Sequence, residues 1–426
     1  MKAVILAGGF GKRLGNVSLN TPKPMTIVCD KPVLEYQINA LRKEGIKEFV
    51  FVVGYLYEQI EAYFGNGEKF GVEITYYKEK APLGTGGALF DLGLNEDFLL
   101  CNGDLIFDFC LEEMLDFHRK NKALATLLTH PNSHPYDSTL LSVSGDGCVE
   151  KIIPKNEKPY AYSNLCNAGI QIVSPEILGL CKASGKVDFD GDIIKPAIKT
   201  GRVYSYKTAE YVKDMGTPER LETVERDIKT GVVEKRHKRH LQKAIFLDRD
   251  GTINVHKGYI KSSEEIELIT GVSQAISRLN SIGYLVIVVT NQPVVARGEC
   301  TLGKLKEINN RIETLLGEKG AYIDEFYCCP HHPDSGFENE IKELKIKCDC
   351  RKPSPGLLLQ AKKDFNIDMA NSFMVGDSLR DVEAGINAGC KSVYLSETDE
   401  GSQSNTIICK SLADFSELLS NRKLNI

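Results

Sequence analysis

Four residues with metal-binding side chains lie close together in the C-terminal half of the chain. Cys329 and His331 are two positions apart, and so are Cys348 and Cys350. Three thiolates and one imidazole suit tetrahedral Zn²⁺, and four protein ligands leave no open position for a substrate. The pattern therefore predicts a structural zinc site. A disulfide clip and a reactive centre are the alternative interpretations of the same cysteines.

A pair of aspartates directly follows the apolar run "KAIFL". Asp248 and Asp250 stand at positions i and i+2, so on an extended chain both carboxylates point the same way. Two such groups can attack phosphorus, protonate a leaving oxygen and activate water. A plain metal site or a turn would use the same residues.

A glycine-rich segment with two cations follows the first apolar run of the chain. "LAGGFGKRLGNVSLNTPKP" contains Gly8, Gly9, Arg13 and Lys23. Glycines let backbone N–H groups approach phosphate oxygens. Because glycine turns are common after strands, the segment alone is a weak sign of nucleotide binding, which the two cations strengthen.

The elements that must position these side chains alternate along the chain. Apolar runs at 2–7 and 243–247 each look like the first strand of an α/β domain, and strands alternate with helical patterns after both. This alternation favours mostly parallel sheets with helices on both faces, whose ligands bind beyond the carboxyl ends of the strands. We expect one domain at 1–230, a polar basic linker at 231–242 and a second domain at 243–426.

Composition limits the class of protein. A chain of 426 residues is too long for one core, and a net charge of -5 argues against a general nucleic-acid binder. No apolar run reaches the ~18 residues of a membrane span, and the N-terminus starts directly with a strand-like run instead of a secretory signal. We expect a cytoplasmic protein whose 13 cysteines are mostly free thiols.

Five ordered motifs in residues 1–225 resemble those of sugar-1-phosphate nucleotidyltransferases. They are the glycine-rich segment ending in "PKPM", then "PLGTGGAL", "NGD", "NAGI" and "DMGTPERL". The resemblance implies a Rossmann-like fold in which a sugar phosphate attacks the α-phosphate of a nucleoside triphosphate and releases pyrophosphate. It implies that Arg13 binds the β- and γ-phosphates, that Lys23 bridges the α-phosphate and the attacking phosphate, and that Asp104 and Asp214 hold Mg²⁺.

The same resemblance implies further substrate contacts in the first domain. The family's Glu-Lys pair, which contacts sugar and phosphate, has two possible counterparts here, and the choice between them stays open. The implied contact residues are Gly8, Gly9, Gly84, Gly86, Asn167 and either Lys155 or Lys158.

Four motifs of the C-terminal half resemble the haloacid-dehalogenase superfamily of phosphatases: "FLDRDGT", "VVTNQ", "CRKP" and "VGDSLRD". The resemblance implies an aspartyl-phosphate on Asp248, with Asp250 as acid and then base. The supporting roles that it implies are phosphoryl binding by Thr290, charge neutralisation by Lys352, Mg²⁺ binding by Asp248, Asp377 and the carbonyl of Asp250, and orientation of that site by Asp381.

Three longer stretches make the resemblance narrower. "IFLDRDGTINVHKGYI", "TNQPVVARG" and "CPHHP…CDCRKP" are similar to the D-glycero-D-manno-heptose 1,7-bisphosphate phosphatases, with histidinol phosphatases as their nearest relatives. This branch implies a haloacid-dehalogenase-like fold whose zinc loop delivers Arg351 and Lys352 to the site. The implied substrate-binding residues are Gly258, Tyr259, Asn291 and Arg351.

Two enzymes on one chain suggest consecutive steps. The phosphatase would leave heptose 1-phosphate, which the transferase would couple to a nucleotide, with GTP favoured, on the way to cell-surface glycans. The expected partners are sugar phosphates, a nucleoside triphosphate, Mg²⁺ and structural Zn²⁺, without nucleic acid or membrane, and a homo-oligomer is compatible with the sequence. The alternatives are a mannose-1-phosphate guanylyltransferase joined to a histidinol-phosphatase-like domain, or one half that only binds or regulates.

Overall fold

The computed structural model describes residues 1–9, 21–181, 185–398 and 406–421, which form two compact units. The first unit contains 1–130, 141–152 and 167–238, and the second contains 131–140, 153–166 and 239–426. Part of the expected linker, which includes helix α6 (Val232–Lys235), groups with the first unit. The expected bounds of 1–230, 231–242 and 243–426 stay predictions.

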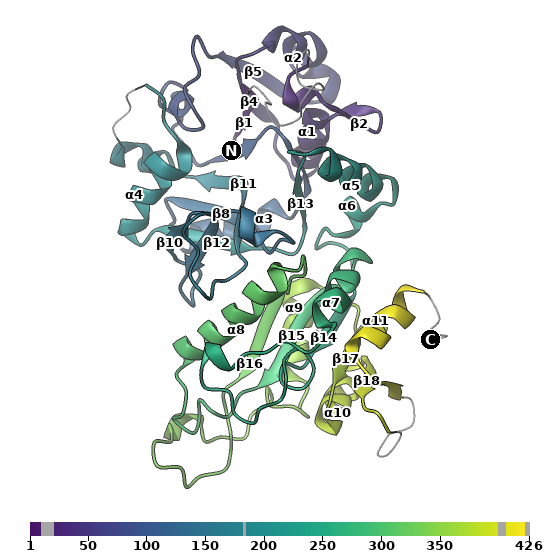
Figure 1. The fold of residues 1–426 in the computed structure, drawn as a ribbon. Coiled ribbons are helices and arrows are strands. Elements are labelled where there is room, and N and C mark those ends of the chain that lie inside the picture. Colours follow the sequence, from purple (N-terminus) through teal and green to yellow (C-terminus); the bar gives the residue numbers. More distant parts are fainter. Residues whose placement is uncertain (10–20, 182–184, 399–405, 422–426) are drawn as a thin grey trace. The chain divides into compact units, whose positions relative to one another are not determined.

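The first unit is built on a nine-stranded sheet with the central order β10-β9-β11-β6-β1-β4-β5, beside which β8 pairs with β11 and β12 (Figure 1). The pairs β1/β4, β1/β6, β4/β5 and β8/β12 are parallel, whereas β11 runs antiparallel to β6. The strands are β1 (Ala3–Leu6), β4 (Glu48–Val53), β5 (Glu73–Lys78), β6 (Phe98–Asn102), β8 (Ala125–His130), β9 (Leu140–Val143), β10 (Val149–Ile153), β11 (Cys166–Val173) and β12 (Val203–Lys207).

Two short sheets and six α-helices complete the described part of the first unit. The sheets are β2 (Ile27–Val28) with β3 (Lys31–Pro32), and β7 (Leu105–Asp108) with β13 (Tyr211–Asp214), both antiparallel. The helices are α1 (Val33–Lys43), α2 (Tyr57–Phe64), α3 (Leu111–Lys120), α4 (Lys195–Ala197), α5 (Pro218–Lys229) and α6. The pairing of β7 with β13 brings the ends of two distant motifs, "NGD" and "DMGTPERL", to one place.

The second unit has a six-stranded sheet in the order β16-β15-β14-β17-β18-β19, with every pair parallel. The strands are β14 (Ala244–Leu247), β15 (Leu285–Asn291), β16 (Glu325–Cys329), β17 (Phe373–Gly376), β18 (Lys391–Leu395) and β19 (Thr406–Cys409). The helices are α7 (Val272–Ser281), α8 (Leu302–Gly317), α9 (Gly356–Phe365), α10 (Leu379–Ala388) and α11 (Leu412–Ser420).

Strand burial explains why the sheet of the second unit positions a site. All four residues of β14 are buried, as expected for a central parallel strand covered on both faces. Its neighbours β15 and β17 are almost entirely buried too. Because all three strands run the same way, the residues that follow them converge at one edge of the sheet.

The expected fold class is confirmed: two α/β units, each with a mostly parallel sheet. Strand β9 is followed along the chain by β10, which lies next to it in the sheet. In the part of the chain that the structure describes, no helix has both the length and the apolar character to span a bilayer.

Candidate active sites

The central feature of the second unit is the ammonium group of Lys352. Its Nζ lies 2.7 Å from Asp248 Oδ1, 2.7 Å from Asp381 Oδ1 and 2.7 Å from the carbonyl oxygen of Val289. Three acceptors match the three hydrogens of an ammonium group, so the side chain, which is 2% exposed, has one defined position. Burial by itself lowers the pKa of Lys352. The negative charges of Asp248 and Asp381 raise it by more, so the pKa lies above the ordinary value.

Three carboxylates share this end of the sheet. The ligand atoms of Asp248, Asp377 and Asp381 all lie within 4.8 Å of one another. Burial and the charge of Asp248 raise the pKa of Asp377, and burial raises the pKa of Asp381 to about 6. A divalent cation with oxygen ligands would relieve this repulsion, so the donor set fits the predicted Mg²⁺ site. Asp381, expected only to orient the site, is itself part of the cluster.

The backbone lies close to the carboxylate of Asp377 at Gly251. This residue has a φ of +86°, and a Cβ there would lie 1.9 Å from Asp377 Oδ2. Glycine is therefore required by both the backbone conformation and the space.

The carboxylate of Asp250 is engaged by three side chains. It accepts hydrogen bonds from Arg249, from Asn254 Nδ2 at 2.9 Å and from Gln292 Nε2 at 2.8 Å. Burial would raise the pKa of Asp250, but the Arg249 charge and these hydrogen bonds hold it below its ordinary value. The three side chains thus hold the carboxylate of Asp250 in one position.

Residues of β15 face the same site. Thr290 is 1% exposed, and its Oγ1 accepts a hydrogen bond of 3.0 Å from Gln292 Nε2. The Asn291 side chain binds the backbone of Lys352 twice: its Nδ2 donates to the carbonyl oxygen and its Oδ1 accepts from the N–H, both at 3.0 Å. Asn291, predicted to bind substrate, therefore positions the lysine in this structure.

The other predicted substrate residues of the second unit are exposed or half-buried. Tyr259 is 49% exposed, and the Arg297 guanidinium lies 4.2 Å from the centre of its ring. Gly258 next to it is exposed, with open space where a Cβ would point. Arg351 Nη1 donates to the carbonyl oxygen of His331 at 3.2 Å, and burial lowers the pKa of Arg351.

The Cys/His residues predicted to bind zinc form one cluster. Cys350 Sγ lies 3.2 Å from Cys329 Sγ, 3.2 Å from Cys348 Sγ and 3.2 Å from His331 Nδ1. The remaining contacts are Cys329 to Cys348 at 3.6 Å and Cys329 to His331 at 3.8 Å. These separations approach the edges of a tetrahedron with Zn–S bonds of ~2.3 Å, and the three cysteines are free of disulfides. The donor set fits Zn²⁺.

In the first unit, the two predicted magnesium ligands lie on neighbouring strands. Asp104 precedes β7, Asp214 ends β13, and the backbone of the next residue, Met215, binds the carbonyl oxygen of Asp104 at 3.2 Å. Lys23 Nζ forms an ion pair with Asp104 Oδ2. Arg220 Nη1 lies 2.7 Å from both oxygens of Asp214. The two carboxylates are ligands of the kind that Mg²⁺ prefers. In this structure Lys23 balances the charge of Asp104, and Arg220 balances that of Asp214.

The pKa of Asp214 reflects this balance. Burial would raise it, but the hydrogen bond and charge of Arg220, with a smaller effect of Lys23, hold it below the ordinary value. The hydroxyl of Thr217 caps α5 by accepting from the Arg220 backbone N–H, which directs the first turn of the helix toward Asp214.

The predicted glycines lie at the ends of elements of the first unit. Gly8 and Gly9 follow β1. Gly84 has a φ of +80°, and a Cβ there would lie 2.3 Å from the carbonyl oxygen of Val187, while at Gly86 it would lie 2.9 Å from Ile193. In this structure Gly84 and Gly86 thus allow their segment to pack closely against Val187 and Ile193.

Asn167 lies at the start of β11, and its side chain contacts the carboxylate of Asp190. Its Nδ2 donates to Asp190 Oδ1 at 3.3 Å, and its Oδ1 accepts from the N–H of Gly169 at 3.1 Å. Burial, together with the charge of Asp188, raises the pKa of Asp190 to about 6. A carboxyl group beside the expected sugar contact was not predicted from the sequence.

Two predicted residues are not brought to either cluster, and a third, Arg13, lies outside the described residues. Lys155 lies 3.8 Å from Asp137, and Lys158 Nζ donates to the carbonyl oxygen of Pro135, all within the second unit. The choice between the two lysines as a sugar contact stays open.

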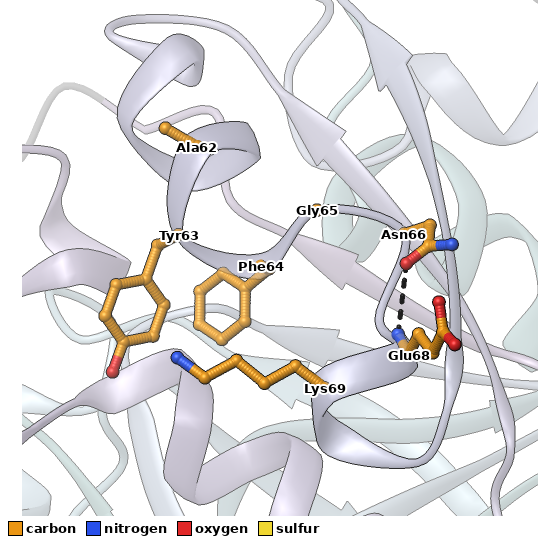
Figure 2. A pocket seen from close by; sticks show the side chains of 7 residues that line it. All are labelled: Ala62, Tyr63, Phe64, Gly65, Asn66, Glu68 and Lys69. Atoms are coloured by element: carbon orange, nitrogen blue, oxygen red, sulfur yellow. Dashed lines mark hydrogen bonds between the residues drawn. The ribbon is translucent and has the colours of Figure 1, made fainter.

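A hollow of about 510 Å³ lies on the first unit, at the end of α2 (Figure 2). The Lys69 ammonium lies 5.6 Å from the centre of the Tyr63 ring, and Figure 2 shows the lysine side chain extended toward this ring. The lining includes none of the predicted site residues and consists of Ala62, Tyr63, Phe64, Gly65, Asn66, Glu68 and Lys69. This hollow is therefore separate from the groups that the motifs single out.

Three residues of the sites were missed in the sequence. Arg220 has a visible signal, since it lies six positions after Asp214 in the first turn of a helix that begins with Pro218. Arg249 lies between two aspartates, where strand alternation would turn it away from both. Gln292 follows Thr290 by two positions, which puts the two side chains on one face, but nothing local identifies its partner Asp250.

Both halves match known families. The model of the nucleotidyl transferase family matches residues 2–231, more than half of the chain, and that of HAD-like hydrolases matches residues 349–414. The D-glycero-beta-D-manno-heptose-1,7-bisphosphate 7-phosphatase of Pasteurella multocida is 38% identical over 188 residues, which are 43% of this chain and 100% of the relative. The protein of the same name from Escherichia coli K12 is 38% identical over 42% of this chain and 95% of its own length.

Two solved structures are similar to one half each. The D,D-heptose 1.7-bisphosphate phosphatase of B. bronchiseptica, complexed with magnesium and phosphate, has 33% identity over 42% of this chain and 99% of its own, with a TM-score of 0.38. HddC from Yersinia pseudotuberculosis, complexed with GMP-PN, has 24% identity over 53% and 99%, with a TM-score of 0.47. On the family matches, this chain is an enzyme that belongs to the nucleotidyl transferase family in its N-terminal half and to the heptose-bisphosphate phosphatase family of HAD-like hydrolases in its C-terminal half.

Proposed function

We propose that the protein is bifunctional and catalyses two consecutive steps of nucleotide-activated heptose synthesis in the cytoplasm. The second unit removes the C7 phosphate of D-glycero-D-manno-heptose 1,7-bisphosphate. The first unit transfers a nucleotidyl group, from GTP, to the resulting heptose 1-phosphate. The relatives that the second half matches over nearly their whole length support the first substrate.

The phosphatase reaction uses two carboxylates in turn. An oxygen of Asp248 attacks phosphorus, the bond from phosphorus to the sugar oxygen breaks, and the leaving oxygen takes a proton from Asp250. Asp250 has to take up this proton when substrate binds, because its pKa in the substrate-free protein lies below the ordinary value. Asp250, now ionised, takes a proton from water, whose oxygen attacks phosphorus and releases Asp248 and inorganic phosphate. Asp250 regains its proton in this second step, so the enzyme returns to its starting state.

The residues around Asp248 suit a transferring phosphoryl group. Lys352 holds the attacking carboxylate and offers positive charge beside it, and Thr290 can donate its hydroxyl hydrogen to a phosphoryl oxygen. Mg²⁺ held by Asp248, Asp377 and the carbonyl of Asp250 would neutralise phosphoryl charge when bound. Asp381 keeps Lys352 in place.

The transferase reaction needs positioning and charge neutralisation more than covalent help. An oxygen of the sugar phosphate attacks the α-phosphorus, and the bond to the bridging oxygen breaks as pyrophosphate leaves. Lys23 would contact the α-phosphate and the attacking phosphate, and Arg13 the leaving phosphates. Asp104 and Asp214 would hold Mg²⁺, which supplies positive charge to the phosphates.

The zinc loop has a structural role in this proposal. Four protein ligands would close the coordination of Zn²⁺, so no ligand position is left for substrate. The loop instead places the residues that directly follow it, Arg351 and Lys352, at the phosphatase site. Thiols of a reducing cytoplasm stay available for the metal.

The observation that carries the proposal is the position of Lys352 between Asp248 and Asp381, with Asp250 two positions after the nucleophile. The test is incubation of the protein with heptose 1,7-bisphosphate, Mg²⁺ and each nucleoside triphosphate in turn. We expect phosphate release in every reaction, and pyrophosphate and a nucleotide-heptose, identified by mass spectrometry, with GTP. Hydrolysis of histidinol phosphate in place of the heptose would contradict the proposed substrate.

A further inference from the structure

Arg249 is fully buried although it carries a permanent positive charge. Its side chain is 0% exposed, and the carboxylate that pairs with it among the described residues is that of Asp250, with Nη2 and Oδ2 2.8 Å apart. A buried charge without a partner is costly. The two side chains therefore depend on each other for their positions.

The Arg249 guanidinium is held in one orientation. It donates to Asp250 through Nη2 and Nε, to Gln292 Oε1 at 3.0 Å and to Asn309 Oδ1 at 3.4 Å. Asn309 is in turn bound to Cys328 Sγ at 3.5 Å. A planar group with acceptors on several sides has little freedom to turn, so it presents Asp250 in a fixed direction.

Gln292 connects Asp250 with the phosphoryl-binding threonine. Its Nε2 donates to Asp250 Oδ2 at 2.8 Å and to Thr290 Oγ1 at 3.0 Å, while its Oε1 accepts from Arg249. Because Thr290 Oγ1 accepts this hydrogen bond, its own hydrogen stays available for another acceptor. One buried amide thus orients two side chains of the site.

We propose that Arg249 and Gln292 are positioning residues of the phosphatase: they hold Asp250 where it can serve the leaving oxygen, and they touch no substrate themselves. This rests on the phosphatase activity proposed above. Arg249, Gln292 and Asn254 together fill the roughly four acceptor positions of the Asp250 carboxylate. A leaving oxygen must therefore replace one donor, and the buried Arg249 is the donor that keeps the carboxylate in place.

The test compares two phosphate esters in single-turnover experiments. Nitrophenolate leaves without a proton, whereas a sugar alkoxide needs one, so loss of acid positioning affects the sugar ester alone in the first step. For Arg249→Lys and for Gln292→Leu we expect sugar release from heptose 1,7-bisphosphate to slow by about 100-fold. The nitrophenolate burst from p-nitrophenyl phosphate should keep its rate within a factor of about 3.

Two variants control for loss of folding. Gln292→Leu changes no charge, so it leaves no buried charge without a partner. Arg278→Lys is the matched control for Arg249→Lys: Arg278, on α7, donates to Ser416 Oγ of α11 at 2.7 Å and contacts no site residue in the described structure. It should leave both rates unchanged.

Equal slowing of both esters, or of neither, in folded variants would overturn the positioning role while leaving the phosphatase proposal intact. Wild-type protein that releases phosphate from neither ester would overturn the proposed phosphatase and the inference together.

Discussion

The ammonium of Lys352 lies 2.7 Å from the carboxylate oxygen of Asp248, although the two residues are 104 positions apart. Asp381 lies at the same distance on another side of the ammonium. The lysine therefore holds the Asp248 carboxylate and balances the charge of two acids at once. This arrangement gives the proposed nucleophile a defined position before any substrate arrives.

Replacing the nucleophile should separate the two activities. In Asp248→Asn, we expect phosphate release to fall below detection, because an amide cannot form the aspartyl-phosphate. Nucleotidyl transfer from supplied heptose 1-phosphate should keep its rate, since its residues belong to a unit with its own core. The measurement is both assays on one preparation.

The melting temperature of Asp248→Asn shows whether the variant is still folded. Lys352 keeps Asp381 as a partner, and loss of one of three crowded carboxylates relieves repulsion, so the melting temperature should change little. A folded variant that has lost both activities would refute two independent sites.

Lys23→Ala should affect the transferase alone. A cation facing phosphate charge that develops in the reaction is worth about 10²–10³-fold in rate, by analogy with loss of one oxyanion donor. We expect pyrophosphate release to fall by that factor and phosphatase activity to persist. Lys31→Ala is a matched control in the same unit, since Lys31 is 49% exposed and pairs with Glu35 at 2.9 Å. Near-normal pyrophosphate release in Lys23→Ala would remove this lysine from the mechanism.

The zinc loop should be required for phosphatase activity without contacting substrate. Purified protein should contain one Zn²⁺ per chain by elemental analysis. The double change Cys348→Ser and Cys350→Ser should remove the metal and lower phosphatase activity, because metal capture and local folding share one free energy. The transferase should keep its rate, since its predicted metal ligands are carboxylate oxygens.

Cys181→Ser serves as the control for this experiment, because Cys181 is a free cysteine of the first unit. It should leave zinc content and both activities as they are. Protein purified without chelator that contains no zinc, or a disulfide among the four residues under reducing conditions, would exclude the zinc site.

Asp190 should make the stability of the first unit depend on pH. Burial raises its pKa to about 6 from the ordinary value of 3.8, so the folded protein binds this proton more tightly than the unfolded chain. The contribution to stability is complete below the unfolded pKa and is lost as pH rises through the folded pKa. Between pH 4 and 7 this amounts to about 1–3 kcal/mol, at ~1.4 kcal/mol for each unit of pKa.

The variant Asp190→Asn removes the titrating group. Denaturant unfolding followed by circular dichroism should show that the variant gains stability relative to the wild type as pH rises from 4 to 7. A difference between the two proteins that stays constant across this range would show that the carboxyl group titrates normally.

The parallel sheets could be predicted because their signal is local. Apolar runs such as 243–247 and 285–291 are long enough to be recognised one at a time, and alternation with helices then determines the class of fold. The antiparallel entry of β11 beside β6 has no such signal, since an apolar run does not show its direction. The Cys329–His331 and Cys348–Cys350 pairs are also local, which is why their spacing predicted a cluster that the structure contains.

The polar network around Asp250 could not be predicted in this way. Arg249 turns back to its neighbour only because the interior offers Gln292 and Asn309 as further acceptors. Similarly, Lys158 donates to a carbonyl oxygen of a loop that precedes it by more than 20 positions. Partners of this kind depend on tertiary packing, and a single sequence does not show which acceptor a long side chain will find.

Lys352 is held in place both by the cysteine cluster that precedes it and by the side chain of Asn291. These two constraints limit which insertions and deletions the gene can tolerate near this lysine. The lysine follows Cys350 by two residues, and its backbone is bound on both sides by the Asn291 amide. Insertion or deletion of a single codon between the two residues would break the link between the metal loop and the sheet. The stretch at 333–347 meets the cysteine cluster only at its ends, so changes of its length outside the segment 337–344, which contacts the rest of the unit, cost little. Length variation among descendants of this gene should therefore accumulate before Cys348 and be absent from the three positions that end at Lys352.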